Sequence, residues 1–192
     1  MKVNDHTLLE AALPVFKTRG IRSASLRDIA SSCGMKLQDL KNQFHSKQIL
    51  VSAFVEYLLV RHSAHLQLNP VLSPTAMSEL RNFYQLVEKL AVVLTPSILF
   101  ELKKYSANGW LKLTEFKDQV LVPYVQQNLQ RGIREGFYRD DIDVELYVKI
   151  YFDLFYVLVT ESKSQHRDNR ILLSQFNKIF LRGILSMRGT RM

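Results

Sequence analysis

Several residue types are scarce in this chain of 192 residues, and each scarcity excludes a class of protein. The single cysteine, Cys33, cannot form an internal disulfide, so nothing demands an oxidising compartment. Only seven glycines and five prolines interrupt a chain that is 47% hydrophobic, which argues against disorder and suffices for one or two compact domains. The apolar run IYFDLFYVLV contains Asp153 and is about half of the roughly 20 residues that a membrane-spanning helix needs. With no apolar core of signal-peptide length near the amino terminus, we expect a soluble, cytoplasmic protein without membrane contact.

Motifs for catalysis and cofactor binding are also missing. The sequence has no glycine-rich phosphate loop, no serine-nucleophile elbow and no paired-carboxylate motif. His62 and His65 lie three residues apart, but no Cys, Asp or Glu stands at ligand spacing beside them, which favours exposed histidines over a metal site. Cys33 falls on an apolar stripe, where its role as a small hydrophobic side chain is favoured over a role as a redox sensor. We therefore expect no enzyme activity, no cofactor and no metal.

Helical periodicity, by contrast, runs along nearly the whole chain, and alternating strand patterns are absent. This periodicity predicts an all-α fold of about nine helices. Gly20 and Gly136 stand where a glycine typically ends a helix. Two prolines and a serine in LNPVLSPT predict a linker over residues 68–75, and a helix break is expected near Asn108-Gly109.

Basic residues outnumber acidic ones, 26 to 18, and the excess is uneven. Eight of the basic residues but only four of the acidic ones lie in residues 1–50, so half of the formal net charge of +8 falls in the first quarter of the chain. Such a basic segment favours a polyanionic partner, nucleic acid before a membrane surface, although moderate charge also serves solubility.

Two short helices joined by a tight turn are predicted for residues 25–44. Ser25, with Asp28 three residues later, forms a capping-box signal for a helix start. One apolar stripe at helical spacing follows, and a second comes after Gly34, which permits the positive φ of a sharp turn. The stripes are Leu26, Ile29, Ala30 and Cys33, and then Leu37, Leu40 and Phe44.

The second of these helices directs a set of polar side chains away from the core. Such a face fits the DNA major groove, where Asn and Gln pair with adenine, Lys with guanine and Asp with the cytosine amino group. Many helices expose a polar face to solvent without binding a partner. The pattern alone therefore does not distinguish a DNA-binding helix from a solvated one. The polar residues are Lys36, Gln38, Asp39, Lys41, Asn42, Gln43 and His45.

Residues 7–56, TLLEAALPVFKTRGIRSASLRDIASSCGMKLQDLKNQFHSKQILVSAFVE, resemble the DNA-binding segment of TetR/AcrR-type transcriptional regulators. The resemblance implies a three-helix helix-turn-helix domain over residues 1–46 and a helical ligand-binding and dimerisation domain over residues 47–192. The matching residues are Ala11, Ala12, Phe16, Gly20, the SLRDIA stretch, Cys33, Gly34, Met35, Leu40, Phe44, Ser46, Lys47 and Leu50.

Carried over by position, the resemblance implies that Ser25 and Lys47 meet DNA phosphates and that residues 36–44 enter the groove. Lys41 stands where the family often has a phosphate-contacting tyrosine, and as a point charge it still suits a phosphate. The chain departs from the family pattern at Lys36, in place of a common N-cap serine, and at the Gln38-Asp39 pair. Asp39 would be repelled by a phosphate but would specify a cytosine, so we expect an unusual operator.

The aromatic side chains predict a second function. Of the 20 aromatic residues, 18 lie beyond residue 46, and some stand where they can line a cavity for an apolar or aromatic small molecule. Aromatic residues at helical spacing are more often plain core, so both readings stay open. The resemblance favours an effector site, although it leaves the effector unidentified. The candidate ligand-binding residues are Phe100, Tyr105, Trp110, Phe116 and Tyr124.

Two long apolar helices, expected over residues 143–164 and 169–188, predict a homodimer interface, because they carry more apolar residues than one face needs. The alternative is that they are central helices of a monomer core. A dimer would present two recognition helices to a palindromic operator in double-stranded DNA. The candidate interface residues are Tyr147, Tyr151, Leu154, Phe155, Leu158, Phe176, Ile179, Phe180 and Ile184.

Together these features predict a sequence-specific DNA-binding transcriptional regulator, a repressor whose DNA binding a small-molecule effector alters. One rival is a helical dimer that binds a small molecule or protein partner without specific DNA recognition. Another is a nonspecific nucleic-acid binder that relies on charge.

Overall fold

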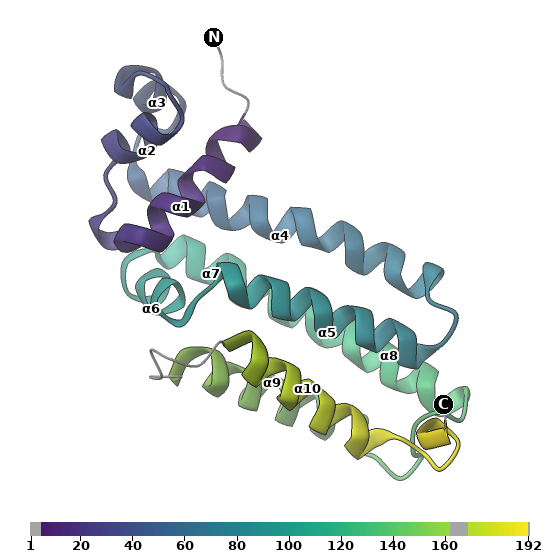
Figure 1. Ribbon diagram of the computed structural model, residues 1–192. Helices are drawn as coiled ribbons and strands as arrows, with labels where there is room; N and C mark the ends of the chain where they lie inside the picture. Colours follow the sequence, from purple (N-terminus) through teal and green to yellow (C-terminus); the bar gives the residue numbers. More distant parts are fainter. Residues whose placement is uncertain (1–4, 162–168, 192) are drawn as a thin grey trace. The chain divides into compact units, whose positions relative to one another are not determined.

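The computed structural model describes residues 5–161 and 169–191, and nearly all of them are helical (Figure 1). The described residues contain no β-strand, only an isolated bridge between Tyr138 and Leu185, so the all-α prediction is confirmed. The elements are α1 (Asp5–Ser23), α2 (Leu26–Ser32), α3 (Leu37–Gln43), α4 (Lys47–Leu72), α5 (Ala76–Val93), α6 (Pro96–Tyr105), α7 (Ala107–Phe116), a π-helical turn η1 (Lys117–Leu121), α8 (Val122–Arg134), α9 (Val144–Glu161), α10 (Asn169–Ile184) and a 3-10 turn η2 (Gly189–Arg191).

The chain forms two compact units. Unit 1 contains the residues up to Arg61 together with Val93–Glu115, and unit 2 contains His62–Val92 and the rest of the chain. Helix α4 therefore contributes Lys47–Arg61 to unit 1 and its remaining residues to unit 2. The functional boundary between residues 46 and 47 stays a prediction.

The core of unit 1 is made from the apolar stripes of α1, α2, α3 and the first part of α4. Phe16 of α1 and Phe54 of α4 are almost completely buried, and their rings meet edge to face with centroids 5.1 Å apart. Ile29 of α2 and Leu40 of α3, one from each predicted stripe, are also fully buried. The predicted pair of short helices is therefore confirmed, and burying these stripes is what holds the two helices in place.

Unit 2 is built around aromatic side chains, with Tyr151 of α9 at their centre. The Tyr151 ring stacks on Tyr84 of α5 at 5.8 Å and on Phe176 of α10 at 5.3 Å, and it meets Phe180 edge to face at 5.1 Å. Offset and edge-to-face pairs at these separations are favourable beyond the area that they bury. The cluster thereby joins α5, α9 and α10, the last two of which run side by side (Figure 1).

Three glycines supply every left-handed backbone position among the described residues: Gly20 (φ 75°), Gly34 (φ 65°) and Gly136 (φ 73°). Gly136 follows the end of α8 as the sequence predicts, whereas Gly20 forms a kink inside α1, which continues to Ser23. Residues with a Cβ rarely adopt this conformation, which explains why glycine stands at all three positions.

The linker expected over residues 68–75 is wrong in extent, because α4 continues through Pro70 and ends at Leu72. The carbonyl groups of Pro70 and Ser73 each accept a hydrogen bond from the Arg131 guanidinium at 3.1 Å. These bonds stabilise the end of α4 and the residue after it, because the last carbonyl groups of a helix have no partner within the helix.

The helix break expected near Asn108-Gly109 is also wrong in position. The break lies at Ser106, between α6 and α7, and Gly109 is buried inside α7. A Cβ on Gly109 would lie 2.8 Å from the Ser106 Oγ and 3.2 Å from the Leu102 Cδ2. Glycine is therefore present for close packing and not to end the helix.

Among the described residues no single helix is long and apolar enough to cross a membrane, although α5 and α6 taken together pass the same test of length and composition. Those residues also contain no group of three or more His, Cys, Asp or Glu side chains placed to hold a metal ion.

Candidate nucleic-acid interface

The start of α2 is fixed by a complete capping box, as the sequence predicts. Ser25 is the N-cap residue, and its Oγ accepts a hydrogen bond from the Asp28 amide at 3.2 Å. The Asp28 carboxylate accepts one from the Ser25 amide at 2.9 Å and pairs with the Arg19 guanidinium at 2.8 Å. The hydrogen bonds from Ser25 hold the pKa of Asp28 below its ordinary value.

Gly34 turns the chain from α2 toward α3. Next to it, the Met35 amide donates to the Ala30 carbonyl at 3.0 Å, which closes the end of α2. Helix α3 begins after Lys36, whose side chain makes no capping hydrogen bond. Because Leu40 is fully buried, the opposite side of α3 faces outward.

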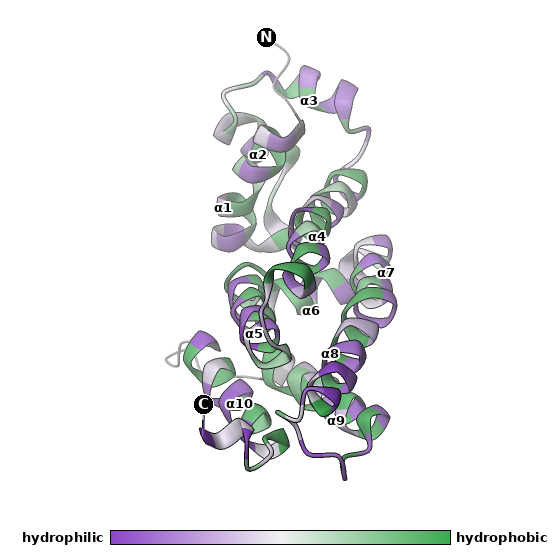
Figure 2. Cartoon of the chain, turned by 90° about the vertical axis from the view of Figure 1, so that its right-hand side faces the viewer, coloured by the Kyte–Doolittle hydropathy of each residue, from purple (hydrophilic) through white to green (hydrophobic). Residues whose placement is uncertain are grey.

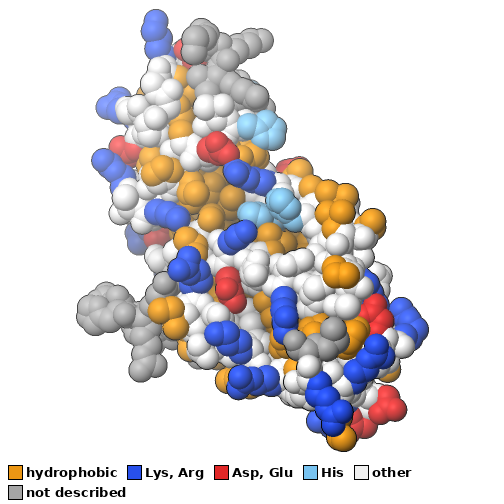
Figure 3. Space-filling model, turned by 45° about the vertical axis from the view of Figure 1, so that its right-hand side comes forward, with side chains coloured by type: hydrophobic (Ala, Val, Ile, Leu, Met, Phe, Trp, Pro, Cys, Tyr) orange, Lys and Arg blue, Asp and Glu red, His pale blue; other side chains and the backbone are white. Residues whose placement is uncertain are grey.

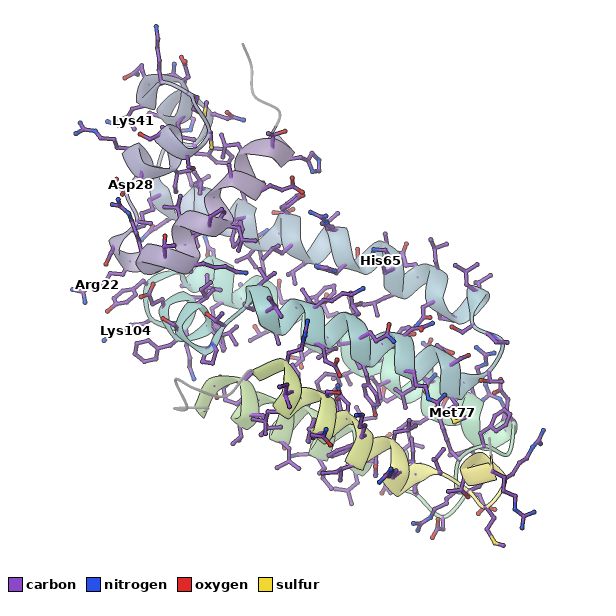
Figure 4. The ribbon with its side chains drawn as sticks, in the orientation of Figure 1. Arg22, Asp28, Lys41, His65, Met77 and Lys104 are labelled. Carbon is purple, nitrogen blue, oxygen red and sulfur yellow. The ribbon has the colours of Figure 1, made fainter. Side chains whose placement is uncertain are left out.

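The outer side of α3 carries the polar side chains that the sequence assigns to DNA, and Figure 2 shows this helix as mostly hydrophilic. The side-chain amides of Gln38 and Asn42, one turn apart, are joined by a hydrogen bond from Nε2 to Oδ1 at 3.2 Å. Gln43 is half-buried, and Lys41 lies on α3 as labelled in Figure 4. The exposed members of the set are Lys36, Gln38, Asp39, Lys41, Asn42 and His45.

Lys47, the first residue of α4, is engaged within unit 1. Its Nζ donates to the Arg22 carbonyl at 2.6 Å, three residues before Ser25. Partial burial lowers the pKa of Lys47, and the negative charge of Glu101 opposes this shift. The phosphate contacts expected of Ser25 and Lys47 stay predictions, but the structure brings both residues to the same turn.

Glu101 of α6 is a member of this site that sequence reasoning missed. Its Oε2 accepts a hydrogen bond from the Arg22 amide at 2.9 Å, across 79 positions of sequence. No motif or periodicity links residues so far apart, so no signal in a single sequence could have found the contact.

The arrangement as a whole presents donors, acceptors and positive charge on one short helix. Residues 1–50 hold eight basic and four acidic side chains, an excess that suits contact with phosphates. Figure 3 shows that Lys and Arg are spread over the whole face that it draws and are not confined to this segment. The dimensions of a helix suit the major groove, where exposed amide and carboxylate groups read base edges.

The comparison with protein families identifies the amino-terminal segment. The model for bacterial regulatory proteins of the tetR family matches residues 8–54, which run from α1 into α4 and include the whole of α2 and α3. This match confirms the resemblance of residues 7–56 to the DNA-binding segment of TetR-type regulators. The chain is a DNA-binding transcriptional regulator.

Relatives of this regulator cover most of its length. It is 25% identical over 161 residues to the HTH-type transcriptional repressor KstR2 of Mycobacterium tuberculosis, covering 79% of this chain and 78% of that protein. The solved structure of that KstR2 matches with a TM-score of 0.69 and 22% identity over 97% of both chains. FadR from Bacillus subtilis, solved with stearoyl-CoA, matches with a TM-score of 0.73 and 18% identity over 94% of this chain and 100% of that one. The two structures show that the fold is shared.

The candidate ligand-binding residues of the regulator are divided between its two units. In unit 1, Phe100 is 62% exposed. Tyr105 and Trp110 are half-buried, and each ring has a lysine ammonium 5.5 Å from its centroid. In unit 2, Phe116 packs against the core, and Tyr124 is buried, with its ring stacked on Phe83. The ligand contacts themselves stay predictions.

Burial also separates the candidate interface residues of the regulator. Tyr151, Phe180 and Ile184 are buried within unit 2, whereas Leu154 is 46% exposed and Ile179 is 69% exposed. The half-buried members are Tyr147, Phe155, Leu158 and Phe176. Residues 162–164 of the first predicted interface helix lie outside the described residues, and the interface itself stays a prediction.

Proposed function

We propose that this regulator is a homodimeric repressor that binds a palindromic operator through α2 and α3 and loses affinity when a small molecule binds it. The observation that carries the proposal is the outer side of α3, where donors and acceptors are exposed beside an α2 helix fixed by its capping box. Such a protein acts in the cytoplasm, where its operator is, and we expect no enzyme activity.

Base reading is proposed to centre on the amide pair Gln38–Asn42. Because Gln38 Nε2 donates to Asn42 Oδ1, the pair presents the Gln38 oxygen as an acceptor and the Asn42 amide hydrogens as donors. Adenine offers the complement in the major groove, an N6 donor next to an N7 acceptor. We therefore propose an A·T pair in each half-site, read by the two amides together.

Asp39 is proposed to read a neighbouring cytosine. Its carboxylate is exposed in the first turn of α3. A carboxylate facing a phosphate is repelled, whereas one at a cytosine amino group accepts a hydrogen bond. Lys36 and Lys41, with Ser25 and Lys47, are then the residues proposed to meet phosphates.

Two copies are proposed to join through α9 and α10. Four exposed apolar residues of α9 recur about one turn apart, and exposed apolar residues of α10 accompany them. Exposed apolar side chains along one side of a helix fit an interaction site. A two-fold dimer would place its two α3 helices at half-sites about 34–36 Å apart or a multiple of it. The exposed residues are Leu146, Ile150, Leu154 and Val157 on α9, and Ile171 and Ile179 on α10.

The effector is proposed to have a large apolar body. The aromatic cluster of unit 2 supports this chemistry, as do two relatives: KstR2 is described as a ketosteroid transcriptional regulator, and FadR was solved with stearoyl-CoA. Phe116 and Tyr124 are the proposed contacts in unit 2. The effector can shift the dimer away from its DNA-binding state only by as much as it prefers the other state.

Selection of duplexes from a randomised pool by the purified protein, at near-physiological salt, tests the proposal. An enriched palindrome with an A·T and a C·G pair in each half-site supports it. Retention that collapses with salt, without enrichment, indicates a nonspecific binder. No retention indicates a helical dimer without DNA recognition.

Sedimentation of the wild type and of Ile179→Glu tests the proposed dimer interface. We expect the wild type to sediment as a dimer and Ile179→Glu to sediment as a monomer.

A further inference from the structure

Both backbone polar groups of Arg22 are held by charged side chains from other helices of unit 1. Its amide donates to the Glu101 carboxylate of α6 at 2.9 Å, and its carbonyl accepts from the Lys47 ammonium of α4 at 2.6 Å. Hydrogen bonds with one charged partner are roughly twice as strong as neutral ones. Arg22 lies just before Ser25, so these two bonds hold the chain at the entrance to α2.

The approach of Glu101 depends on Gly20. A Cβ at position 20 would lie 2.6 Å from the Glu101 Oε1 and 2.9 Å from Oε2, closer than real Cβ contacts come. Gly20 also has φ 75° and ψ 163°, which turns the backbone so that the next amides can face α6. The glycine therefore does more than interrupt α1, because it makes room for the carboxylate.

A cation–aromatic contact joins α1 and α6 at the same place. The Arg22 guanidinium lies 5.4 Å from the centroid of the Tyr105 ring of α6. Lys104, which is itself on α6, has its ammonium 5.5 Å from the same centroid. Figure 4 shows Arg22 and Lys104 on the same side of unit 1. Glu101 thus belongs to a packed contact and is not a stray surface carboxylate.

We propose that Glu101 is a positioning residue for DNA binding, which fixes residues 20–22 and thereby places Ser25 and Lys47 for their phosphates. Glu101 touches neither the outer side of α3 nor its amide pair. Phosphate contacts set affinity, whereas base contacts set sequence preference. Losing this carboxylate therefore weakens binding to all DNA alike and leaves the preferred sequence unchanged. The inference rests on the proposed function, since it concerns how unit 1 meets its operator.

Glu101→Ala, assayed on the operator that the wild type selects, is the first test. We expect affinity to fall about tenfold, the value of one lost hydrogen bond to a charged group. The selected sequence is expected to stay the same, and hydrogen exchange of the Arg22 amide to become faster. Glu101→Gln keeps an oxygen that accepts from this amide and should retain most of the affinity. Glu115→Ala, which removes the same charge from an exposed position on α7, is the matched control and should bind as wild type.

Gly20→Ala provides an independent second test. Its Cβ displaces the carboxylate, and the positive φ of position 20 strains any residue with a Cβ, so the variant is expected to lose more affinity than Glu101→Ala. In the double variant the strain stays but the clash between the two side chains is absent, so its loss should be smaller than the sum of the two single losses.

The proposal is overturned if Glu101→Ala binds the operator as tightly as the wild type does. It is also overturned if hydrogen exchange of the Arg22 amide is the same in the two proteins. If Glu101→Ala proves unstable, the affinity of Glu101→Gln decides, because a loss as large as that of Gly20→Ala contradicts a role for the accepted hydrogen bond. If the wild type selects no sequence, it is the proposed function that fails. Exchange at Arg22 in Glu101→Ala then still decides whether the carboxylate fixes this turn.

Discussion

The guanidinium of Arg131 donates to the carboxylate of Glu79 at 2.8 Å, and Glu79 is only 2% exposed. Arg131 also pairs with Glu135 at 2.6 Å and donates to the carbonyl groups that end α4. Within unit 2, one side chain of α8 therefore joins α4 and α5, and Glu79 depends on it for its ion pair.

Replacing Arg131 with Met should lower the free energy of unfolding by about 3–5 kcal/mol, because it leaves a buried carboxylate without its partner. Urea denaturation at pH 7 measures the loss. The double variant Arg131→Met, Glu79→Leu should recover part of it, since no charge is then left buried. Arg139→Met, which breaks an exposed pair with Asp141, is the control and should cost less than about 1 kcal/mol. Equal losses for the two single variants would contradict the argument.

Gly132→Ala should destabilise unit 2, because a Cβ there would lie 2.0 Å from the Cδ2 of Tyr138, a ring that is 2% exposed. Overpacking of this kind costs about 1–3 kcal/mol. Gly183→Ala, at an exposed position of α10, is the milder change, because its Cβ would lie 3.1 Å from the Tyr147 hydroxyl and alanine favours the helix, so it should cost less than Gly132→Ala. Thermal unfolding of both variants checks the prediction, and a Gly132→Ala protein that melts with the wild type would refute it.

Asp28 should make unit 1 sensitive to acid. Hydrogen bonds from Ser25 hold its pKa in the folded protein below the ordinary value of 3.8, so the unfolded chain binds the proton more readily. The stabilisation is complete well above pH 3.8 and is lost as the pH falls through the lower pKa of the folded state. We expect the urea midpoint of the wild type to fall more between pH 7 and pH 3 than that of Asp28→Asn. Parallel falls would show that Asp28 contributes nothing to the pH dependence.

Gln38 and Asn42 should act as one unit in DNA recognition. If the two amides read a single A·T pair together, Gln38→Ala and Asn42→Ala should relax preference at the same operator position, each by about 1–3 kcal/mol. The double variant should then lose little more than either single one. Duplex selection with the three variants measures this. Losses at two different positions that add would mean that each amide reads its own base. Gln48→Ala, exposed at the start of α4, serves as the control.

Local signals in the sequence predicted the start of the DNA-binding unit well. The capping box of Ser25 and Asp28 involves residues three apart, and the stripe through Ile29 and Leu40 follows from helical periodicity. Both depend only on neighbours in the chain, which a single sequence displays. The partner of Arg22 comes from 79 residues away and leaves no such signal.

Periodicity was less informative for α9 and α10, because both are apolar on more than one side. The sequence could show that Tyr151, Leu154 and Ile179 lie on apolar faces, but not which face turns inward. In unit 2 the stacking of Tyr151 on the rings of α5 and α10 decides this, and leaves Leu154 and Ile179 exposed. Which of two apolar faces becomes buried depends on contacts with other helices. The helical pattern of a single segment contains no information about those contacts.

The turn before α3 carries a consequence for chirality. Gly34 has φ 65°, and nothing lies within 4 Å of a Cβ built on it. For an L-residue, the strained backbone and not a lack of space is therefore the limit at this position. L-Alanine would be strained, whereas D-alanine, introduced by chemical ligation, favours this very conformation and restricts the unfolded chain. A D-alanine protein should be more stable than the natural one by about 0.4–1 kcal/mol and bind its operator unchanged. The recognition helix thus begins at a point where the mirror-image amino acid is the better building block.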